Sequence, residues 1–594
     1  MGRLVVAVAA SAALCAWAAA PRALAQSPRA AIEGELDDEL RSAIAQAIGE
    51  TDRPIQNRFD ARRRARDAAE DAMAVLRSEG YYAHEVEPDL TDTEPPVPIV
   101  RVSPGPRFAV ADPKVEWVGE PPQPEVREAA ESALLLRPGD PGRAVDVLAA
   151  EGRAVAAVQK SGYADVAAAP REVIVDHADA TLRPTFRINA GELVRLDGLQ
   201  LETRGRTNPA WVQRLAPWRV GDPYDPEDVA ELERRLLDTG VYESVTVGLG
   251  PKETTTPEGL RPIVVSLADR ERRTLELGAS YSTTDGAGVD ARWTRYNVIG
   301  RADTLELLAR LSDIDSRLGA ELALPHWRRA QQTLQLGGAV YQVRTDAYDE
   351  TGAGVHADVT RRYGKTSYLT LGATLDFSRT DELRRGTLSP LGRDLVTGTL
   401  LGALALDRSD DPLDPKRGWR VEARAEPTLI TGEDTLPYLK LQTQGSAYYP
   451  LDDDGRTVVA GRLRLGTMVG GSIPEVPASR RFYAGGGGSV RGYGYQAVGP
   501  RLADNTPQGG VSLLEASLEV RRHLFGRWGM AAFVDGGTVG TDPFPAGKDF
   551  SLGAGLGVRY DLGFGPIRVD VAVPLDRRTS DAPFQVYLSI GQSF

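Results

Sequence analysis

Cysteine is almost absent from this chain of 594 residues. The one cysteine, Cys15, lies in an apolar, alanine-rich run at Leu4–Ala20. Arg3 precedes that run and an Ala-Leu-Ala triplet ending at Ala25 follows it, which is the order of a secretory signal peptide cleaved after the triplet. We therefore expect residues 1–25 to be removed rather than kept as a membrane anchor. The mature chain then has no thiol, which excludes disulfides and cysteine metal sites.

Long hydrophobic runs are also missing after residue 25, where no stretch approaches the about 18 apolar residues of a transmembrane helix. The formal net charge is −13 and the mean hydropathy is slightly negative. These averages do not by themselves indicate a soluble protein, because a transmembrane β-barrel alternates lipid-facing and polar residues and so has a similar mean hydropathy. The acidic balance gives no support for nucleic-acid binding.

Residues that carry catalytic or metal chemistry are sparse. The histidines are scattered, with no pair at the spacing of metal ligands, and there is no Gly-x-Ser-x-Gly elbow or other nucleophile constellation. The glycine run at 485–488 lacks the Gly-Lys-Ser/Thr ending and the following helix of a phosphate loop. We therefore predict no catalytic residue, no metal and no cofactor, and we expect that the protein is not an enzyme.

The sequence pattern changes near residue 270, from helices alternating with short strands to sustained period-two alternation. The clearest helix follows Asp225, a candidate N-cap, with Pro226 at its first position. Its predicted apolar face consists of Val229, Leu232, Leu236 and Leu237. Gly240 ends the helix and Tyr242 opens the next strand. The region before residue 270 is therefore predicted to contain both helices and strands.

The same order of elements occurs three times in the N-terminal half. A helix-ending glycine closely followed by a tyrosine recurs at Gly80, Gly162 and Gly240, and an upstream turn glycine recurs at Gly34, Gly119 and Gly198. Such self-similarity at a fixed period indicates tandem domains, each with the order strand, helix, helix, strand, strand. We predict three domains, at 26–105, 106–189 and 190–269.

Alternation of apolar and polar residues dominates from residue 274 onward. The first predicted strand places Leu275, Leu277, Ala279 and Tyr281 on one face. A transmembrane strand needs about 10 residues, so residues 270–594 with their loops supply about sixteen strands. A soluble β-sandwich is the alternative, but it seldom has so many regular strands or keeps Glu and Arg along one whole face. We predict an all-β transmembrane barrel of about 16 antiparallel strands.

The last predicted strand has its own apolar face, interrupted only by Gln592. That face consists of Phe584, Val586, Leu588, Ile590 and Phe594. An aromatic residue at the rim fits the aromatic girdle of outer-membrane barrels. The pattern also matches the terminal signal by which such barrels are recognised for insertion. We therefore predict an insertion signal with Phe594 at the rim.

Residues 482–500 read FYAGGGGSVRGYGYQAVGP and carry a resemblance to a known family. The chain resembles the BamA/TamA superfamily of POTRA-barrel outer-membrane proteins in a loop motif made by Val490, Arg491, Gly492 and Tyr493. It also resembles the family's Phe-x-Asp-x-Gly segment at Phe533, Asp535 and Gly537. Similar positions in the strands that close such barrels are Gly555, Gly557, Arg559, Gly565, Pro566, Asp570 and Pro574. The resemblance implies that the loop folds back into the lumen and that Arg491 pairs with Asp535.

The physics of such a pair is independent of the family. An arginine in a polar, partly dehydrated lumen needs an acceptor, because an unpaired buried charge is costly. A bidentate arginine–carboxylate pair fixes both distance and plane, and so pins a mobile loop to a wall. The alternative is a surface arginine with a solvated partner, worth about 0–1 kcal/mol. Removing a lumenal Arg491 should loosen the barrel rather than delete a catalytic group.

The number of repeats distinguishes branches of the family. Three POTRA-like units resemble the TamA branch, whereas BamA-type chains usually carry five and two-partner secretion transporters two. The resemblance implies an outer-membrane translocation and assembly factor with its N-terminal domains in the periplasm. Its cargo would be outer-membrane proteins such as autotransporters, or lipid, handled at a weak lateral seam between the first and last strands.

The partners implied by the resemblance are a TamB-type inner-membrane-anchored periplasmic protein, unfolded outer-membrane protein substrates and outer-membrane lipid, with no nucleic acid. Two other functions stay open at this point. One is a two-partner-type secretion transporter for a dedicated passenger. The other is a passive outer-membrane channel, which would not need tandem periplasmic domains.

Overall fold

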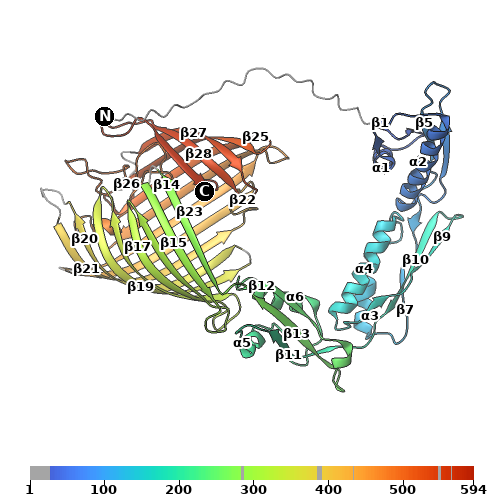
Figure 1. Cartoon of the computed structure of the whole chain (residues 1–594), viewed down its shortest axis with the longest axis horizontal. Helices are drawn as coiled ribbons and strands as arrows, with labels where there is room; N and C mark the ends of the chain where they lie inside the picture. The colour runs from blue at the N-terminus through green and yellow to red at the C-terminus, as the bar shows by residue number, and fades with distance from the viewer. Residues whose placement is uncertain are drawn as a thin grey trace, which may run out of the picture. The chain divides into compact units, whose positions relative to one another are not determined.

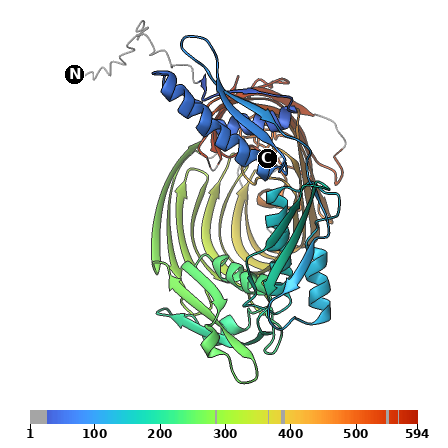
Figure 2. The ribbon, with the colours of Figure 1, turned by 90° about the vertical axis from the view of Figure 1, so that its right-hand side faces the viewer.

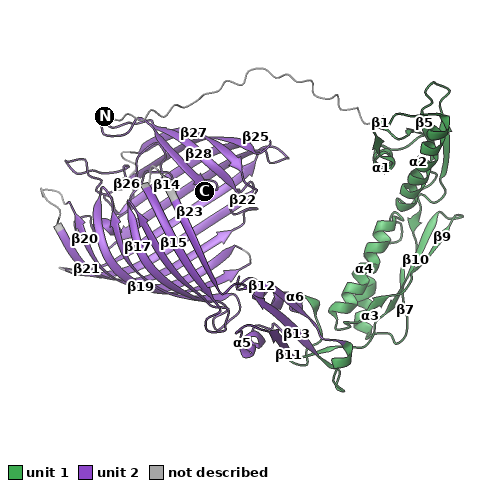
Figure 3. Cartoon of the chain, in the orientation of Figure 1, with its two compact units in different colours: residues 1–197, 220–227, 252–261 green, residues 198–219, 228–251, 262–594 purple. Residues whose placement is uncertain are grey.

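The computed structural model describes residues 27–282, 286–364, 366–383, 391–432, 434–545, 550–563 and 565–594, so the signal peptide expected at 1–25 lies outside the described residues. The chain divides into two compact units (Figure 3). The first is Met1–Asp197, Val220–Glu227 and Lys252–Arg261; the second is Gly198–Arg219, Asp228–Pro251 and Pro262–Phe594. None of the helices in the described ranges is long and apolar enough to cross a membrane.

The first unit opens with an α/β repeat (Figure 1). Its elements are β1 (Ser27–Pro28), β2 (Ala31–Glu33), α1 (Asp38–Ile48), β3 (Glu50–Thr51), α2 (Arg58–Ser78), β4 (Glu85–Leu90) and β5 (Pro98–Ser103). The side chains of Asp37 and Asn57 accept backbone N–H groups in the first turns of α1 and α2, which explains where both helices begin. The sheet has the order β2-β5-β4.

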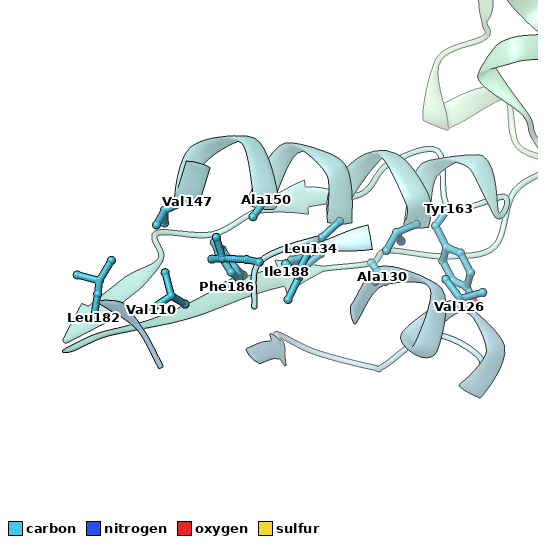
Figure 4. Packing of buried hydrophobic residues seen from close by; sticks show 14 residues of the cluster. Val110, Val126, Ala130, Leu134, Val147, Ala150, Tyr163, Leu182, Phe186 and Ile188 are labelled. Atoms are coloured by element: carbon cyan, nitrogen blue, oxygen red, sulfur yellow. The ribbon is translucent and has the colours of Figure 1, made fainter. Parts of the chain in front are cut away.

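The second repeat packs two helices on a sheet centred on β10. Its elements are β6 (Ala109–Val110), β7 (Lys114–Trp117), α3 (Pro124–Ala133), α4 (Ala144–Lys160), β8 (Ala167–Ala168), β9 (Glu172–Asp176) and β10 (Thr181–Asn189). Strand β10 is parallel to β7 and antiparallel to β9. Phe186 and Ile188 of β10 lie beside Leu134 and below Val147 and Ala150 of α4 (Figure 4). This repeat therefore has a conventional apolar core.

The third repeat is divided between the two units. It contains β11 (Arg195–Thr203), α5 (Pro209–Gln213), α6 (Pro226–Leu237), β12 (Tyr242–Leu249), η1 (Lys252–Thr254) and β13 (Leu260–Asp269), with sheet order β11-β13-β12. Asp225 accepts the backbone N–H of Glu227 and Pro226 opens α6, as predicted. Leu237 was predicted on the buried face of α6, but it is 44% exposed. It lies about 100° around the helix from buried Leu236, beyond the apolar stripe.

Residues from 273 onward form one sixteen-stranded antiparallel sheet (Figures 1 and 2). The strands are β14 (Arg273–Ser282), β15 (Gly286–Tyr296), β16 (Thr304–Ser312), β17 (Asp315–Leu324), β18 (Gln332–Arg344), β19 (Tyr348–Tyr363), β20 (Ser367–Glu382), β21 (Leu391–Asp407), β22 (Gly418–Thr431), β23 (Thr435–Pro450), β24 (Thr457–Val469), β25 (Ser512–Phe525), β26 (Trp528–Gly540), β27 (Ser551–Asp561), β28 (Pro566–Pro574) and β29 (Gln585–Ile590). Each strand pairs with its sequence neighbours. The predicted sixteen-stranded barrel is confirmed.

Side chains of the barrel strands alternate between an apolar outer face and a polar lumen. Leu275 and Leu277 of β14 are 65% and 76% exposed. On β25, exposed Leu518 stands between Ser517 and Glu519, which are buried toward the lumen. This arrangement suits a wall with lipid outside and polar groups inside.

The last strand does not continue to Phe594. Phe584 and Leu588 are exposed on one face, but β29 ends at Ile590 and Gly591 has a φ of +84°. The following residues turn into the lumen, where Phe594 packs beside buried side chains of β23 and β24, namely Tyr448, Val458 and Ala460. The prediction of a rim position for Phe594 is wrong, because the left-handed turn at Gly591 moves it to the opposite side of the wall.

Candidate functional site in the barrel lumen

A long loop, residues 470–511, connects β24 to β25 and lies inside the barrel. Val490 and Tyr493 are 0% and 2% exposed. They belong to an apolar cluster in which loop residues pack against side chains of the wall; its wall members include Met468, Leu513 and Val539. The loop is therefore held in the lumen by a small core of its own.

Arg491 forms a bidentate ion pair with Asp535 of β26. Its Nε lies 2.6 Å from Asp535 Oδ2, and its Nη2 lies 3.0 Å from Oδ1. The backbone N–H of Arg491 also donates to Oδ2, at 3.1 Å. Both side chains are almost fully buried. One carboxylate thus holds the side chain and the backbone of Arg491, which fixes the loop in distance and orientation.

Two further carboxylates converge on the same guanidinium from other strands. Nη1 of Arg491 lies 2.8 Å from Glu519 Oε2 and 3.2 Å from Asp570 Oδ2. Arg521 and Arg559 balance this negative charge, at 2.8 Å from Glu519 and 2.5 Å from Asp570. Such compensation is required, because buried ions without partners lose several kcal/mol of hydration. We call this cluster of Arg491, Asp535, Glu519 and Asp570 the Arg491 pin.

Glycines allow the loop backbone to lie directly on the wall. Gly492 has a φ of +103°, and a Cβ there would lie 2.7 Å from the carbonyl oxygen of Val573. A Cβ at Gly537 would lie 2.7 Å from Val490 Cγ2. A Cβ at Gly553 would overlap the carbonyl oxygen of Arg491. The glycines of both motifs therefore provide clearance for the pin.

Tyr587 connects the motif to the last strand. Its hydroxyl accepts the N–H of Gly492 at 3.1 Å and donates to the carbonyl oxygen of Tyr493 at 3.0 Å. The hydroxyl of Tyr493 donates to the carbonyl oxygen of Leu552 at 3.1 Å. The sequence pattern alone did not single out Tyr587, although its alternation with Val586 and Leu588 places it on the lumenal face.

The residues after Gly591 join the same network. Ser593 Oγ donates to Glu519 Oε2 at 3.1 Å, and Arg521 Nη2 donates to the carbonyl oxygen of Phe594 at 3.1 Å. Glu519 therefore binds both the loop and the residues that follow β29. Glu519 and Arg521 were also missed from the sequence, where they are two of many charged residues on alternating strands.

The structure brings together all seven residues of the two predicted motifs, whereas the predicted insertion signal is divided between faces. Phe584 and Leu588 are exposed, Val586 is partly buried and Phe594 is in the lumen, whereas the side chain of Ile590 lies outside the described residues. In the described part of the chain, no group of three His, Cys, Asp or Glu residues is arranged to hold a metal ion. The site is suited to holding a loop in place, since its polar groups are engaged with one another.

The two ends of the sixteen-stranded sheet form a weak seam. Strand β14 has ten residues and β29 has six, and they lie next to each other. Within the ranges that the structure describes, no hydrogen-bonded ladder joins them, whereas β28 pairs with β29 from Ile567↔Ile590 to Ala572↔Gln585. A short edge strand of this kind is a template for pairing with another strand.

The turns between β15 and β16 and between β17 and β18 contact the third repeat. The contacting residues all belong to the second unit. Asn297 Nδ2 donates to Thr207 Oγ1 at 3.0 Å, and both residues are buried. His326 Nε2 lies 2.8 Å from the carbonyl oxygen of Arg235, and its Nδ1 lies 3.0 Å from the backbone nitrogen of Gln331. Burial lowers the pKa of His326 below its ordinary value. We call these contacts the repeat–barrel joint.

Comparison with known proteins identifies the family of the barrel. Residues 297–594 match the Omp85 superfamily domain. The chain belongs to the Omp85 superfamily. It is 22% identical over 444 residues to the outer membrane protein assembly factor BamA of Neorickettsia risticii, covering 70% of this chain and 58% of that protein. It is also 22% identical over 604 residues to BamA of Neisseria meningitidis, covering 91% of this chain and 74% of that protein.

Among solved structures, the chain is similar to BamA from Haemophilus ducreyi lacking POTRA domains 1–3. The TM-score is 0.69 at 17% identity, covering 82% of this chain and all of that chain. This likeness supports the fold of a barrel with POTRA-type repeats. The chain spans little more than half the length of the Neorickettsia protein.

Proposed function

We propose that this protein is a translocation and assembly factor of the TamA type in the outer membrane, with its three repeats in the periplasm. Its activity is to aid the insertion or secretion of outer-membrane proteins such as autotransporters, with lipid as a further cargo. The observation that carries the proposal is the weak seam between β14 and β29, next to a lumen that contains the long loop.

The seam supplies a physical route for insertion. Unpaired backbone N–H and C=O groups are costly in lipid, so an incoming β-strand gains hydrogen bonds by pairing with an exposed edge. The turn at Gly591 ends β29 after six residues, whereas β14 has ten, so β29 is too short to pair along all of β14. A substrate strand is therefore the partner that the edge of β14 fits best.

The periplasmic repeats provide a second mode of substrate binding. Strand β9 is an edge of the second repeat's sheet, and its Val173 and Ile174 are 36% and 52% exposed. Extended chains add to such edges through main-chain hydrogen bonds. The first repeat is proposed to bind a TamB-type inner-membrane-anchored protein, because the three-repeat organisation resembles the TamA branch. Crosslinking from α1 or α2 followed by identification of the captured protein tests this partner.

A seam lock tests the proposed function. Because the chain has no cysteine after residue 25, two cysteines introduced in a Cys15→Ser background can form a disulfide only with each other. One cysteine is introduced at a position within Leu275–Ala279 of β14 and one at a position within Val586–Ser589 of β29. The pair of positions that forms a disulfide on oxidation is used for the test. We expect oxidation to abolish insertion of an autotransporter barrel into proteoliposomes, and reduction to restore it.

The matched control is a disulfide between Leu318 and Val340, which face each other on β17 and β18, away from the seam. This lock should leave insertion unchanged. Insertion at an undiminished rate through an oxidised seam would refute the proposal. A two-partner secretion transporter would instead show one dedicated passenger among the secreted proteins lost on deletion of the gene.

The lumen also bears on the passive-channel alternative. Loop side chains such as Val490 and Tyr493 are buried there against the wall, whereas a solute channel needs an open path. Planar-bilayer recordings separate the two functions: a wide, steady, solute-selective conductance of the unmodified protein would favour a channel.

A further inference from the structure

The long loop contacts the wall at a second place, before the Arg491 motif. A short 3₁₀ helix, η2 (Ala478–Arg480), precedes Arg481, whose Nη2 lies 3.2 Å from Glu382 Oε2 on β20. The backbone N–H of Ala478 donates to the same oxygen at 2.6 Å. Arg393 of β21 lies 3.0 Å from the other oxygen, Oε1. The Glu382 side chain is fully buried.

This arrangement repeats the chemistry of the Arg491 pin with unrelated residues. In both places one buried wall carboxylate accepts a loop guanidinium and a loop backbone N–H. We call Glu382, Arg393, Arg481 and the N–H of Ala478 the Glu382 clasp. A carboxylate with these donors specifies position more narrowly than apolar packing does, because charge-assisted hydrogen bonds are directional.

The two arginines of the clasp also hold the loop backbone. Arg393 donates to the carbonyl oxygens of Glu475 and Pro474, at 2.8 and 2.6 Å. Arg481 donates to the carbonyl oxygens of Ile473 and Gln508, each at 2.9 Å. Because these residues lie at the two ends of the loop, Arg481 ties its two limbs together.

Neighbouring contacts extend the clasp to β19 and β23. Arg480 Nη2 lies 2.8 Å from Asp376 and 3.2 Å from Glu350. Lys440 of β23 donates to the carbonyl oxygen of Arg480 at 2.9 Å. The start of the loop is therefore attached to four wall strands, β19, β20, β21 and β23.

The clasp and the pin use different arcs of the wall. The clasp is centred on β20 and β21, and the pin is on β25, β26 and β28, with β22 to β24 between them in the sheet. We propose that the Glu382 clasp is a second, independent positioning site, and that the loop is a strut across the lumen that holds β19 to β29 as one rigid wall.

The strut restricts how the barrel moves. Release of Arg491 alone leaves the loop attached through Glu382, so the loop stays in the lumen. Movement is confined to the strands outside the braced wall, β14 to β18, which form one side of the seam, because Tyr587 holds β29 to the loop. This inference concerns the mechanics of the barrel and goes beyond the proposed function; it stands whether the cargo is protein, lipid or neither.

A double-mutant cycle tests the clasp by planar-bilayer conductance. The variants are Arg491→Ala, Glu382→Gln and their combination, with Glu382→Gln chosen because it keeps the shape and removes the charge. Either the Arg491 pin or the Glu382 clasp alone retains the loop, so the pore of each single variant should open only briefly. The double variant should conduct steadily, exceeding the summed conductance of the singles about tenfold, as expected of coupled sites.

The matched control is Asp381→Asn, one residue earlier on β20, which removes the same charge. The Asp381 side chain is 45% exposed and lies 3.7 Å from Arg379 rather than beside the loop. Combined with Arg491→Ala, it should leave conductance at the level of Arg491→Ala. The proposal is overturned if Glu382→Gln adds no more conductance than Asp381→Asn.

A reversible lock separates loss of the clasp from loss of folding. The hydroxyl oxygens of Thr380 and Ser479 lie 3.3 Å apart, so cysteines at these positions can link the loop to the wall. With Cys15→Ser and the double variant as background, oxidation should return conductance to that of Arg491→Ala, and reduction should raise it again. Unchanged conductance on oxidation, with the disulfide verified by mass and a normal heat-modifiable gel shift, contradicts the strut.

Discussion

The second repeat and the barrel are packed by opposite rules. In the repeat, Phe186 and Ile188 are fully buried. In the barrel, Leu277 is 76% exposed, whereas Glu519 and Asp535 are fully buried. The difference follows from the solvent: water drives apolar groups inward, and lipid accepts them on the outside while polar groups gather in the lumen.

The two kinds of interior also differ in what they specify. Burial of apolar surface is proportional to area and has no direction. The Arg491 pin depends on the positions of individual oxygens and nitrogens. We therefore expect the repeat to respond mainly to lost volume, and the lumen to respond to lost charge even where little volume changes.

The largest effect is expected for Asp535→Ala. This change leaves Arg491 buried without its bidentate partner, and removal of one partner of a buried pair costs about 3–5 kcal/mol. The midpoint of heat unfolding, followed by the gel mobility of the barrel, should fall accordingly. Asp394→Ala is the control, because Asp394 is 80% exposed in its pair with Arg379 and should contribute only about 0–1 kcal/mol. Equal midpoints for the two variants would contradict a lumenal pin.

In the second repeat, Phe186→Ala should cost about 3–5 kcal/mol through the lost apolar contacts and the cavity left behind. Hydrogen exchange of α4 should quicken, while the heat midpoint of the barrel stays constant. Val173→Ala in the exposed edge strand β9 is the control and should leave exchange in α4 near its original rate. A barrel destabilised by Phe186→Ala would show that the two interiors are not independent.

A smaller effect is expected for Gly553→Ala. The added methyl group overlaps the carbonyl oxygen of Arg491, and overpacking of this kind costs about 1–3 kcal/mol. Gly445→Ala in β23 is the matched control, because a Cβ there meets nothing within 4 Å. Heat midpoints that are lowered equally by both substitutions would show that general strand propensity, rather than contact with the loop, decides the result.

The smallest effect concerns pH at the repeat–barrel joint. Neutral His326 donates from Nε2 to Arg235 and accepts at Nδ1 from Gln331, so protonation of Nδ1 destroys the second bond. Since burial lowers its pKa, the joint should be fully stable above the ordinary histidine pKa of about 6.5 and weaken as pH falls through the lowered value. Amide exchange at the joint, corrected for intrinsic rates, measures this, and His326→Gln should abolish the dependence. Retention of the dependence in that variant would assign it to another group.

Much of the fold was predictable because its signals are local. Period-two alternation and turn residues predict the strands of the barrel, and the capping of α6 by Asp225 is visible within a few residues. The lumen contacts are different, since the neighbours of a lumenal side chain depend on the tilt and stagger of all strands. Glu382 and Arg481 are 99 residues apart in the chain, and no local pattern connects them.

The error at Phe594 has a similar physical origin. Counting alternate positions assumes that the strand continues, and one left-handed residue reverses the face of everything after it. Gly591 is one of 62 glycines in the chain, so its presence gave little reason to end the strand there.

The inward turn at Gly591 has a mechanical consequence. Residues 592–594 could extend β29. If the turn at Gly591 became extended, these three residues would continue the strand along β14. That movement would withdraw Ser593 from Glu519 and Phe594 from the side chains of Arg462 and Arg521. A change in the length of β29 would thereby be coupled to the contacts of Glu519 and Arg521 beside Arg491.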